Sequence, residues 1–137
     1  MNKAGGWLAA LLVGAYLIFE VTHLQRFSYR MEPGYILDEL VHADQAVRRC
    51  GGPSETERSR FLRNFEIMQG RALQALLEED PTLAASEAQA RLDEQIAATI
   101  QAVDAVVDEQ GCKDGQVWRW QKLHSVRARL NLQPAAA

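Results

Sequence analysis

Residues 4–19 of this 137-residue chain carry no charged side chain, and the run begins directly after Lys3. A basic residue followed by an uncharged apolar run is typical of a membrane-targeting segment. A helix over residues 4–22 would be about 28 Å long at about 1.5 Å per residue, enough to span a slightly thin bilayer. The rest of the chain then suffices for one small domain of roughly 100 residues.

The end of the apolar run decides between an anchor and a cleaved signal peptide. Residues 20–26 offer no pair of small residues at the spacing of a signal-peptidase site. We therefore expect residues 1–24 to form an uncleaved signal-anchor, a single-pass transmembrane helix that contacts membrane lipid through residues 4–22. Because the apolar run also has the length of a signal-peptide core, a secreted chain released by cleavage is the alternative.

Aromatic residues follow the predicted anchor. Phe27 and Tyr29 lie in the expected stalk, residues 25–34, and Tyr35 comes directly after it. Aromatic rings are enriched at the headgroup level of a bilayer. We therefore predict that these three side chains contact the membrane interface.

Beyond the stalk, the apolar residues recur at steps of three and four, and no run alternates with the period of two that a strand requires. This pattern predicts an all-α domain over residues 35–132, a bundle of three to four helices, followed by a disordered tail over residues 133–137. The expected inward stripes are Ile36, Leu40, Ala43, Val47 and Cys50; then Phe61, Phe65, Met68, Ala72 and Leu76; then Ala85, Ala88, Leu92, Ile96, Thr99, Val103 and Val106.

Local signals place the helix ends. Ser54 followed by Glu57 predicts a capping box at the start of the second helix of the domain. Asp80 before Pro81 predicts the start of the third helix, because a missing amide costs nothing in the first turn. Gly111 predicts its left-handed stop. These two helices, nearly equal in length, are expected to form a long antiparallel hairpin.

The two cysteines of the chain flank this predicted hairpin. Cys50 lies just before its first helix and Cys112 just after its second, so the hairpin brings both to the same end. We therefore predict a disulfide between Cys50 and Cys112. A disulfide indicates an oxidising compartment, which places the domain on the extracytoplasmic, periplasmic side of the membrane.

The last helix is expected over residues 116–130, with Trp120, Leu123, Val126 and Leu130 facing inward. Trp118 then lies on a different face, next to Arg119 and Lys122. Tryptophan and arginine are enriched at protein interfaces, so these three residues are a candidate partner surface. His124 is predicted to lie at the surface or in that interface.

No catalytic or cofactor motif is present. The chain lacks C-x-x-C, P-loop, G-x-S-x-G and H-E-x-x-H patterns, and its net charge of −3 gives no general affinity for nucleic acid. The pattern E-x-x-H occurs at Glu20–His23 and at Glu39–His42, but a di-iron bundle needs further inward glutamates, of which only Glu66 is a candidate. We expect no metal, no cofactor and no enzymatic activity.

These features predict a non-catalytic, membrane-anchored extracytoplasmic helical protein, an accessory or interaction subunit of a larger membrane-associated complex with a protein partner. The first alternative is a secreted helical binding module or inhibitor released by signal-peptide cleavage. The second is a metal- or cofactor-binding helical bundle with Glu39 and His42 as its ligands.

Overall fold

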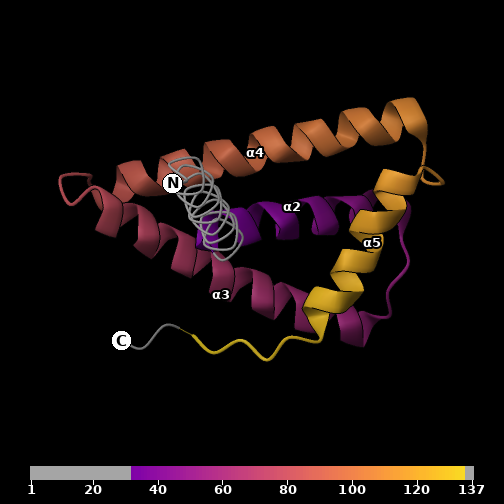
Figure 1. Cartoon of the computed structure of the whole chain (residues 1–137), viewed down its shortest axis with the longest axis horizontal. Coiled ribbons are helices and arrows are strands. Elements are labelled where there is room, and N and C mark those ends of the chain that lie inside the picture. Colours follow the sequence, from indigo (N-terminus) through magenta and orange to yellow (C-terminus); the bar gives the residue numbers. More distant parts are fainter. Residues whose placement is uncertain (1–31, 135–137) are drawn as a thin grey trace, which may run out of the picture. The chain divides into compact units, whose positions relative to one another are not determined.

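The computed structural model describes residues 32–134, which form four helices and contain no strand. The helices are α2 (Pro33–Cys50), α3 (Glu55–Glu79), α4 (Ala85–Gln110) and α5 (Gly115–Ala128) (Figure 1). The prediction of an all-α, bundle-like domain is confirmed. No helix in this described part is long and apolar enough to cross a bilayer. The predicted anchor over residues 1–24, most of the stalk, Phe27 and Tyr29 lie outside the described residues.

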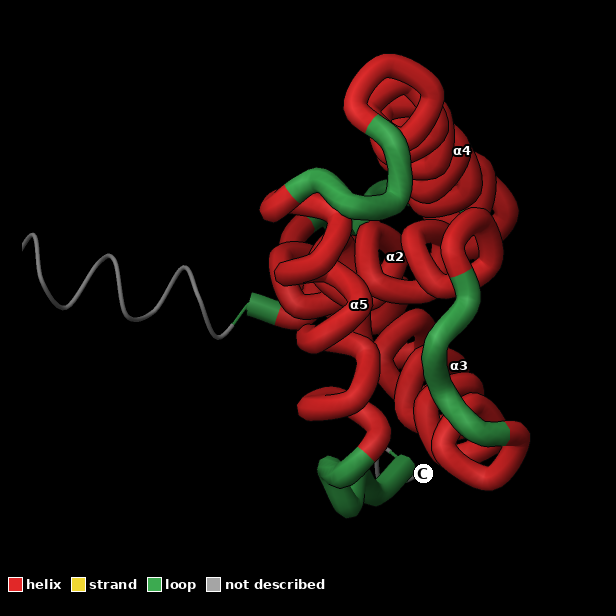
Figure 2. The backbone as a smooth tube through the Cα atoms, turned by 90° about the vertical axis from the view of Figure 1, so that its right-hand side faces the viewer, coloured by secondary structure: helices red, strands yellow, loops and turns green. Residues whose placement is uncertain are grey.

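Helix α2 is the centre of the bundle and contacts each of the other three helices. Helices α3 and α4 run in opposite directions but diverge from the turn at residues 80–84, with α2 between them (Figure 1). Helix α5 crosses the open end of this arrangement in front of the end of α2 in Figure 1, and Figure 2 shows it beside α2 when viewed from that end. Helices α3 and α4 therefore have the antiparallel order of the expected hairpin, but α2 lies between them and keeps them apart.

The composition of α2 explains its central place. The predicted stripe of Leu40, Ala43 and Val47 is buried, but so are apolar residues on neighbouring faces: Leu37, Val41 and Ala46. A single stripe would cover one neighbouring helix, whereas this wider apolar surface has room for three. The hairpin opens because α2 buries its apolar surface against both arms.

The predicted capping box at Ser54 is confirmed in part, and the predicted helix end at Gly111 is confirmed. The Ser54 hydroxyl accepts from the Glu57 amide at 3.3 Å, as the capping box requires, whereas the Glu57 carboxylate is engaged with α5. Gly111 ends α4 with a φ of +80°, a conformation that favours glycine, and its amide donates to the Val107 carbonyl.

The predicted start of α4 is wrong. Helix α4 begins at Ala85, and Asp80 instead forms the C-terminal boundary of α3. The Asp80 carboxylate accepts from the amide and the hydroxyl of Thr82, at 3.1 and 2.6 Å, so it closes a local turn. The amide of Ala84 donates to the Glu87 carboxylate at 3.2 Å at the start of α4.

The predicted disulfide between Cys50 and Cys112 is present, with the two Cα atoms 5.5 Å apart. It joins the last residue of α2 to the loop after α4. Polar contacts continue along the same pair of helices: Arg49 donates to Asp104 and Asp108 at 2.7 and 2.5 Å. Hydrogen bonds from Gln45 and then Arg49 lower the pKa of Asp104. The bridge and these ion pairs hold α4 against α2.

Candidate functional site

The outer face of α5 carries the exposed apolar side chains of the domain. Within residues 32–134, the large apolar residues that stand exposed are Trp118 at 55%, Val126 at 57% and Leu130 at 37%. Trp118, Lys122 and Val126 follow one another at steps of four along one side of α5, and Leu130 comes just after the helix ends. We call these four residues the α5 ridge.

The predicted partner-surface residues fall on or beside this ridge. The Lys122 ammonium lies 5.5 Å from the centre of the Trp118 ring, within the range of a cation–π contact. Arg119 is exposed beside Trp118. No acidic side chain occurs between Gly115 and Ala128, so the whole of α5 is basic and its outer face is both apolar and cationic.

The inner face of α5 differs from the sequence-based prediction. Val117, His124 and Ala128 are buried, whereas Val126 and Leu130, which were expected inward, are exposed. His124 was expected at the surface, and this prediction is wrong because its side chain is fully enclosed. Its ring stacks on that of Phe61, with the two ring centres 3.9 Å apart and 15° between the planes.

His124 lies among charged groups from two other helices. Its Nδ1 is 3.7 Å from Oε1 of Glu57, which also accepts from the Ser125 hydroxyl at 2.6 Å. Neither ring nitrogen has a hydrogen-bond partner among residues 32–134. Burial lowers the pKa of His124, against the attraction of Asp44 on α2 and Glu57 on α3, while Arg58 lowers this pKa further. The net effect favours the neutral form of the imidazole.

This burial predicts a loss of stability in mild acid. Because the pKa of His124 is lower in the folded chain than in the unfolded one, the unfolded state binds more protons as the pH falls. The neutral, buried His124 stabilises the fold fully above about pH 6.5, which is the pKa of histidine in the unfolded chain. Below that pH the free energy of unfolding decreases. We expect the urea midpoint to fall between pH 7.5 and 5.5, and the fall to be smaller in His124→Gln. Equal falls in the two proteins would contradict this assignment.

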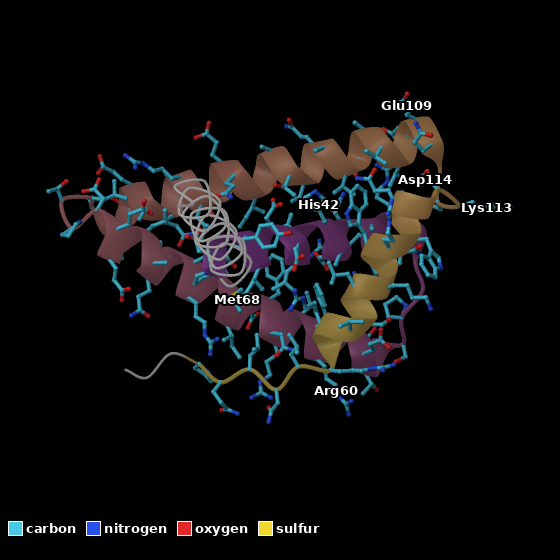
Figure 3. All side chains as sticks on the ribbon, in the orientation of Figure 1. His42, Arg60, Met68, Glu109, Lys113 and Asp114 are labelled. Carbon is cyan, nitrogen blue, oxygen red and sulfur yellow. A yellow bond between two sulfur atoms is a disulfide. The ribbon has the colours of Figure 1, made fainter. Side chains whose placement is uncertain are left out.

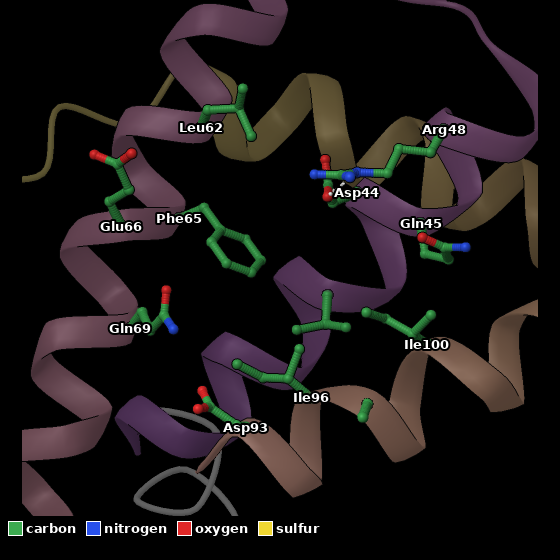
Figure 4. A pocket seen from close by; sticks show the side chains of 12 residues that line it. Asp44, Gln45, Arg48, Leu62, Phe65, Glu66, Gln69, Asp93, Ile96 and Ile100 are labelled. Carbon is green, nitrogen blue, oxygen red and sulfur yellow. Dashed lines mark hydrogen bonds and ion pairs between the residues drawn. The ribbon is translucent and has the colours of Figure 1, made fainter. Parts of the chain in front are cut away.

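A cleft of about 450 Å³ opens between α2, α3 and α4 (Figure 4). It exists because α3 and α4 diverge around α2, and the sequence alone gave no sign of it. Its walls combine apolar side chains with an ion pair, in which Arg48 donates to Asp44 at 2.7 Å. The lining residues are Val41, Asp44, Gln45, Arg48, Leu62, Phe65, Glu66, Gln69, Asp93, Ile96, Ala97 and Ile100.

The second E-x-x-H pair does not form a joint ligand set. Glu39 pairs with Arg127, while Nδ1 of His42 lies 2.8 Å from the Asp38 carbonyl oxygen and its ring packs near Trp120. Within residues 32–134, no three His, Cys, Asp or Glu side chains are grouped so that they could hold a metal ion. Glu20 and His23 lie outside the described residues.

The remaining predicted residue, Tyr35, is half-buried in the first turn of α2. Figure 3 shows His42 on α2 and, at the far end of α4, Lys113 and Asp114 in the loop before α5. The chain matches no protein-family model, no curated protein and no solved structure. Because it is exposed and apolar, the α5 ridge is the candidate site of this domain. The buried His124 and Phe61 pair packs beneath α5.

Proposed function

We propose that this chain is a non-catalytic, membrane-anchored extracytoplasmic protein whose helical domain is an accessory or interaction subunit of a larger complex. The observation that carries the proposal is the α5 ridge, which gathers the exposed large apolar side chains of the described domain on one basic helix and the residues just after it. Exposed tryptophan with neighbouring cations is typical of interface anchors. The partner that fits has an apolar centre and acidic groups around it.

Two further features support the location. The disulfide between Cys50 and Cys112 is typical of an oxidising compartment, and the uncharged run over residues 4–19 is typical of a membrane anchor. Together they favour an anchored domain on the periplasmic side.

Site-specific photocrosslinking in the native membranes tests the ridge. A photoreactive residue at Trp118 or at Val126 should give the same discrete crosslinked species, because both side chains lie on the ridge. The control position is Gln101, which is exposed on α4. We expect no such species from Gln101, and we expect Lys122→Glu to weaken the crosslink while Lys113→Glu, in the loop before α5, leaves it unchanged. Equal crosslinking from all three positions would contradict the proposal.

The alternative of a secreted helical binding module has one observation in its favour. The cleft between α2, α3 and α4 has an apolar wall and the volume of a small-molecule site. The two functions differ at the amino terminus, because a secreted module would have lost the uncharged run.

A further inference from the structure

We propose that a second hollow, between α3 and the segment that follows α5, binds a phosphate-type anion. The hollow has a volume of about 240 Å³, and three arginines line it: Arg60 and Arg63 from α3, and Arg129 from the end of α5. Its other lining residues are Asn64, Ala128, Leu130 and Asn131. The hollow borders the α5 ridge at Leu130, but none of its three arginines belongs to the ridge, and the proposal does not rest on the proposed function.

The charge of this hollow is not compensated by the described domain. Its lining contains three guanidinium groups and no carboxylate. None of the three arginines forms an ion pair or a hydrogen bond with a side chain in residues 32–134. All three are exposed, and Figure 3 shows Arg60 near the end of α5. Three like charges around one small hollow repel one another, and a bound anion would relieve that repulsion.

The backbone around the hollow is held by specific bonds. The buried Asn64 amide donates to the carbonyls of Arg127 and Leu130, at 2.8 and 2.9 Å. Further along, Arg71 donates to the Gln133 carbonyl at 2.5 Å, and Leu132 packs against the core. The segment after α5 is therefore tied to α3, which fixes Arg129 opposite the two arginines of that helix.

A purely structural role explains this arrangement less well. A cation at the end of α5 offsets the negative pole of the helix, which accounts for Arg129. Arg60 and Arg63 lie beyond the first turn of α3, which begins at Glu55, so the dipole of that helix accounts for neither cation. They are three residues apart and so project from the same side of α3.

The chemistry of guanidinium groups selects the ligand class. Arginine presents a planar fork of donors that matches phosphate oxygens in bidentate fashion. Three such groups provide more charge than one carboxylate can balance, and a phosphate dianion with several free oxygens suits them better. The ligand is therefore inorganic phosphate or a phosphomonoester, either free in solution or on a lipid headgroup.

Phosphate titration of the full-length chain in neutral detergent tests the inference. Amide chemical shifts would be followed by NMR while inorganic phosphate replaces chloride at constant ionic strength. We expect saturable shifts confined to residues 60–64 and 129–131, and at least a tenfold weaker affinity in Arg60→Gln/Arg63→Gln. The matched control is Arg91→Gln, which removes the same charge from an exposed position on α4 and should bind like the wild type.

Shifts that are linear, scattered or unchanged in the double variant would overturn the proposal, provided that circular dichroism shows a folded variant. A second experiment distinguishes a lipid headgroup from a soluble anion as the ligand. The chain is placed in nanodiscs of phosphatidylcholine with or without phosphatidic acid, and the titration is repeated. If phosphatidic acid produces the same shifts and blocks the response to phosphate, the ligand group is a lipid headgroup. If it has no effect, the site takes a soluble anion.

Discussion

Replacing Cys50 and Cys112 together by serine should lower the free energy of unfolding by about 4 kcal/mol. The bridge closes a loop with a sequence separation of 62 residues, and the chain-entropy model gives about 4 kcal/mol for a loop of this length. In a domain of this size, that loss corresponds to a fall in melting temperature on the order of 15–30 °C. Thermal and urea unfolding followed by circular dichroism would measure it.

Reduction supplies the control for this prediction. Wild-type protein treated with a thiol reductant should unfold at the same midpoint as the double serine variant, because both lack the bridge. A double variant as stable as the oxidised wild type would show that the bridge does not constrain the unfolded chain.

The second large effect is expected at Phe61. Its side chain is fully buried and stacks on His124, with a further tilted contact to Phe65 at 6.3 Å. Phe61→Ala leaves a cavity under α5 that the surrounding helices can fill only in part, and such a change typically costs about 3–5 kcal/mol. Urea unfolding at pH 7.5 would measure this loss.

Phe65→Ala is the matched control. It removes the same side chain one turn later on α3, but Phe65 is half-buried and lines the cleft, so its loss should be clearly smaller. Equal losses at the two positions would contradict the assignment of Phe61 to the centre of the core.

The sequence predicted the elements of this fold better than their packing. Four helices, the stop at Gly111 and the pairing of Cys50 with Cys112 follow from local signals and from the lengths of α3 and α4. The central place of α2 could not be predicted, because it depends on which helices share its apolar surface. The prediction of the Cys50–Cys112 disulfide is nevertheless correct, because the end of α2 stays close to the end of α4 when α3 and α4 diverge.

The errors on α5 have a physical reason. Two sets of positions on this helix have helical spacing: Trp120, Leu123, Val126 and Leu130, or Val117, Trp120, His124 and Ala128. The first set is more apolar, but only its Trp120 and Leu123 pack against the core. In the second set Val117, His124 and Ala128 are buried, and the imidazole of His124 stacks on the Phe61 ring. The α5 ridge therefore contains two residues expected in the core.

The cleft and the arginine hollow could not be predicted from the sequence either. Each joins residues that are far apart in the chain, such as Arg60 and Arg129, and their proximity arises only when α5 crosses the open end of α3 and α4. Periodicity identifies the face of a helix on which a residue lies. It does not identify the neighbouring helix.

A native mass spectrum of the protein, extracted from its own membranes in mild detergent, tests the central proposal most directly. It reports amino-terminal processing, the state of the disulfide and the partner proteins in one experiment. We predict the full-length, oxidised chain, with residues 1–24 retained, inside a larger assembly. A chain that appears alone and shortened at its amino terminus would contradict the anchored-subunit proposal and favour a secreted binding module.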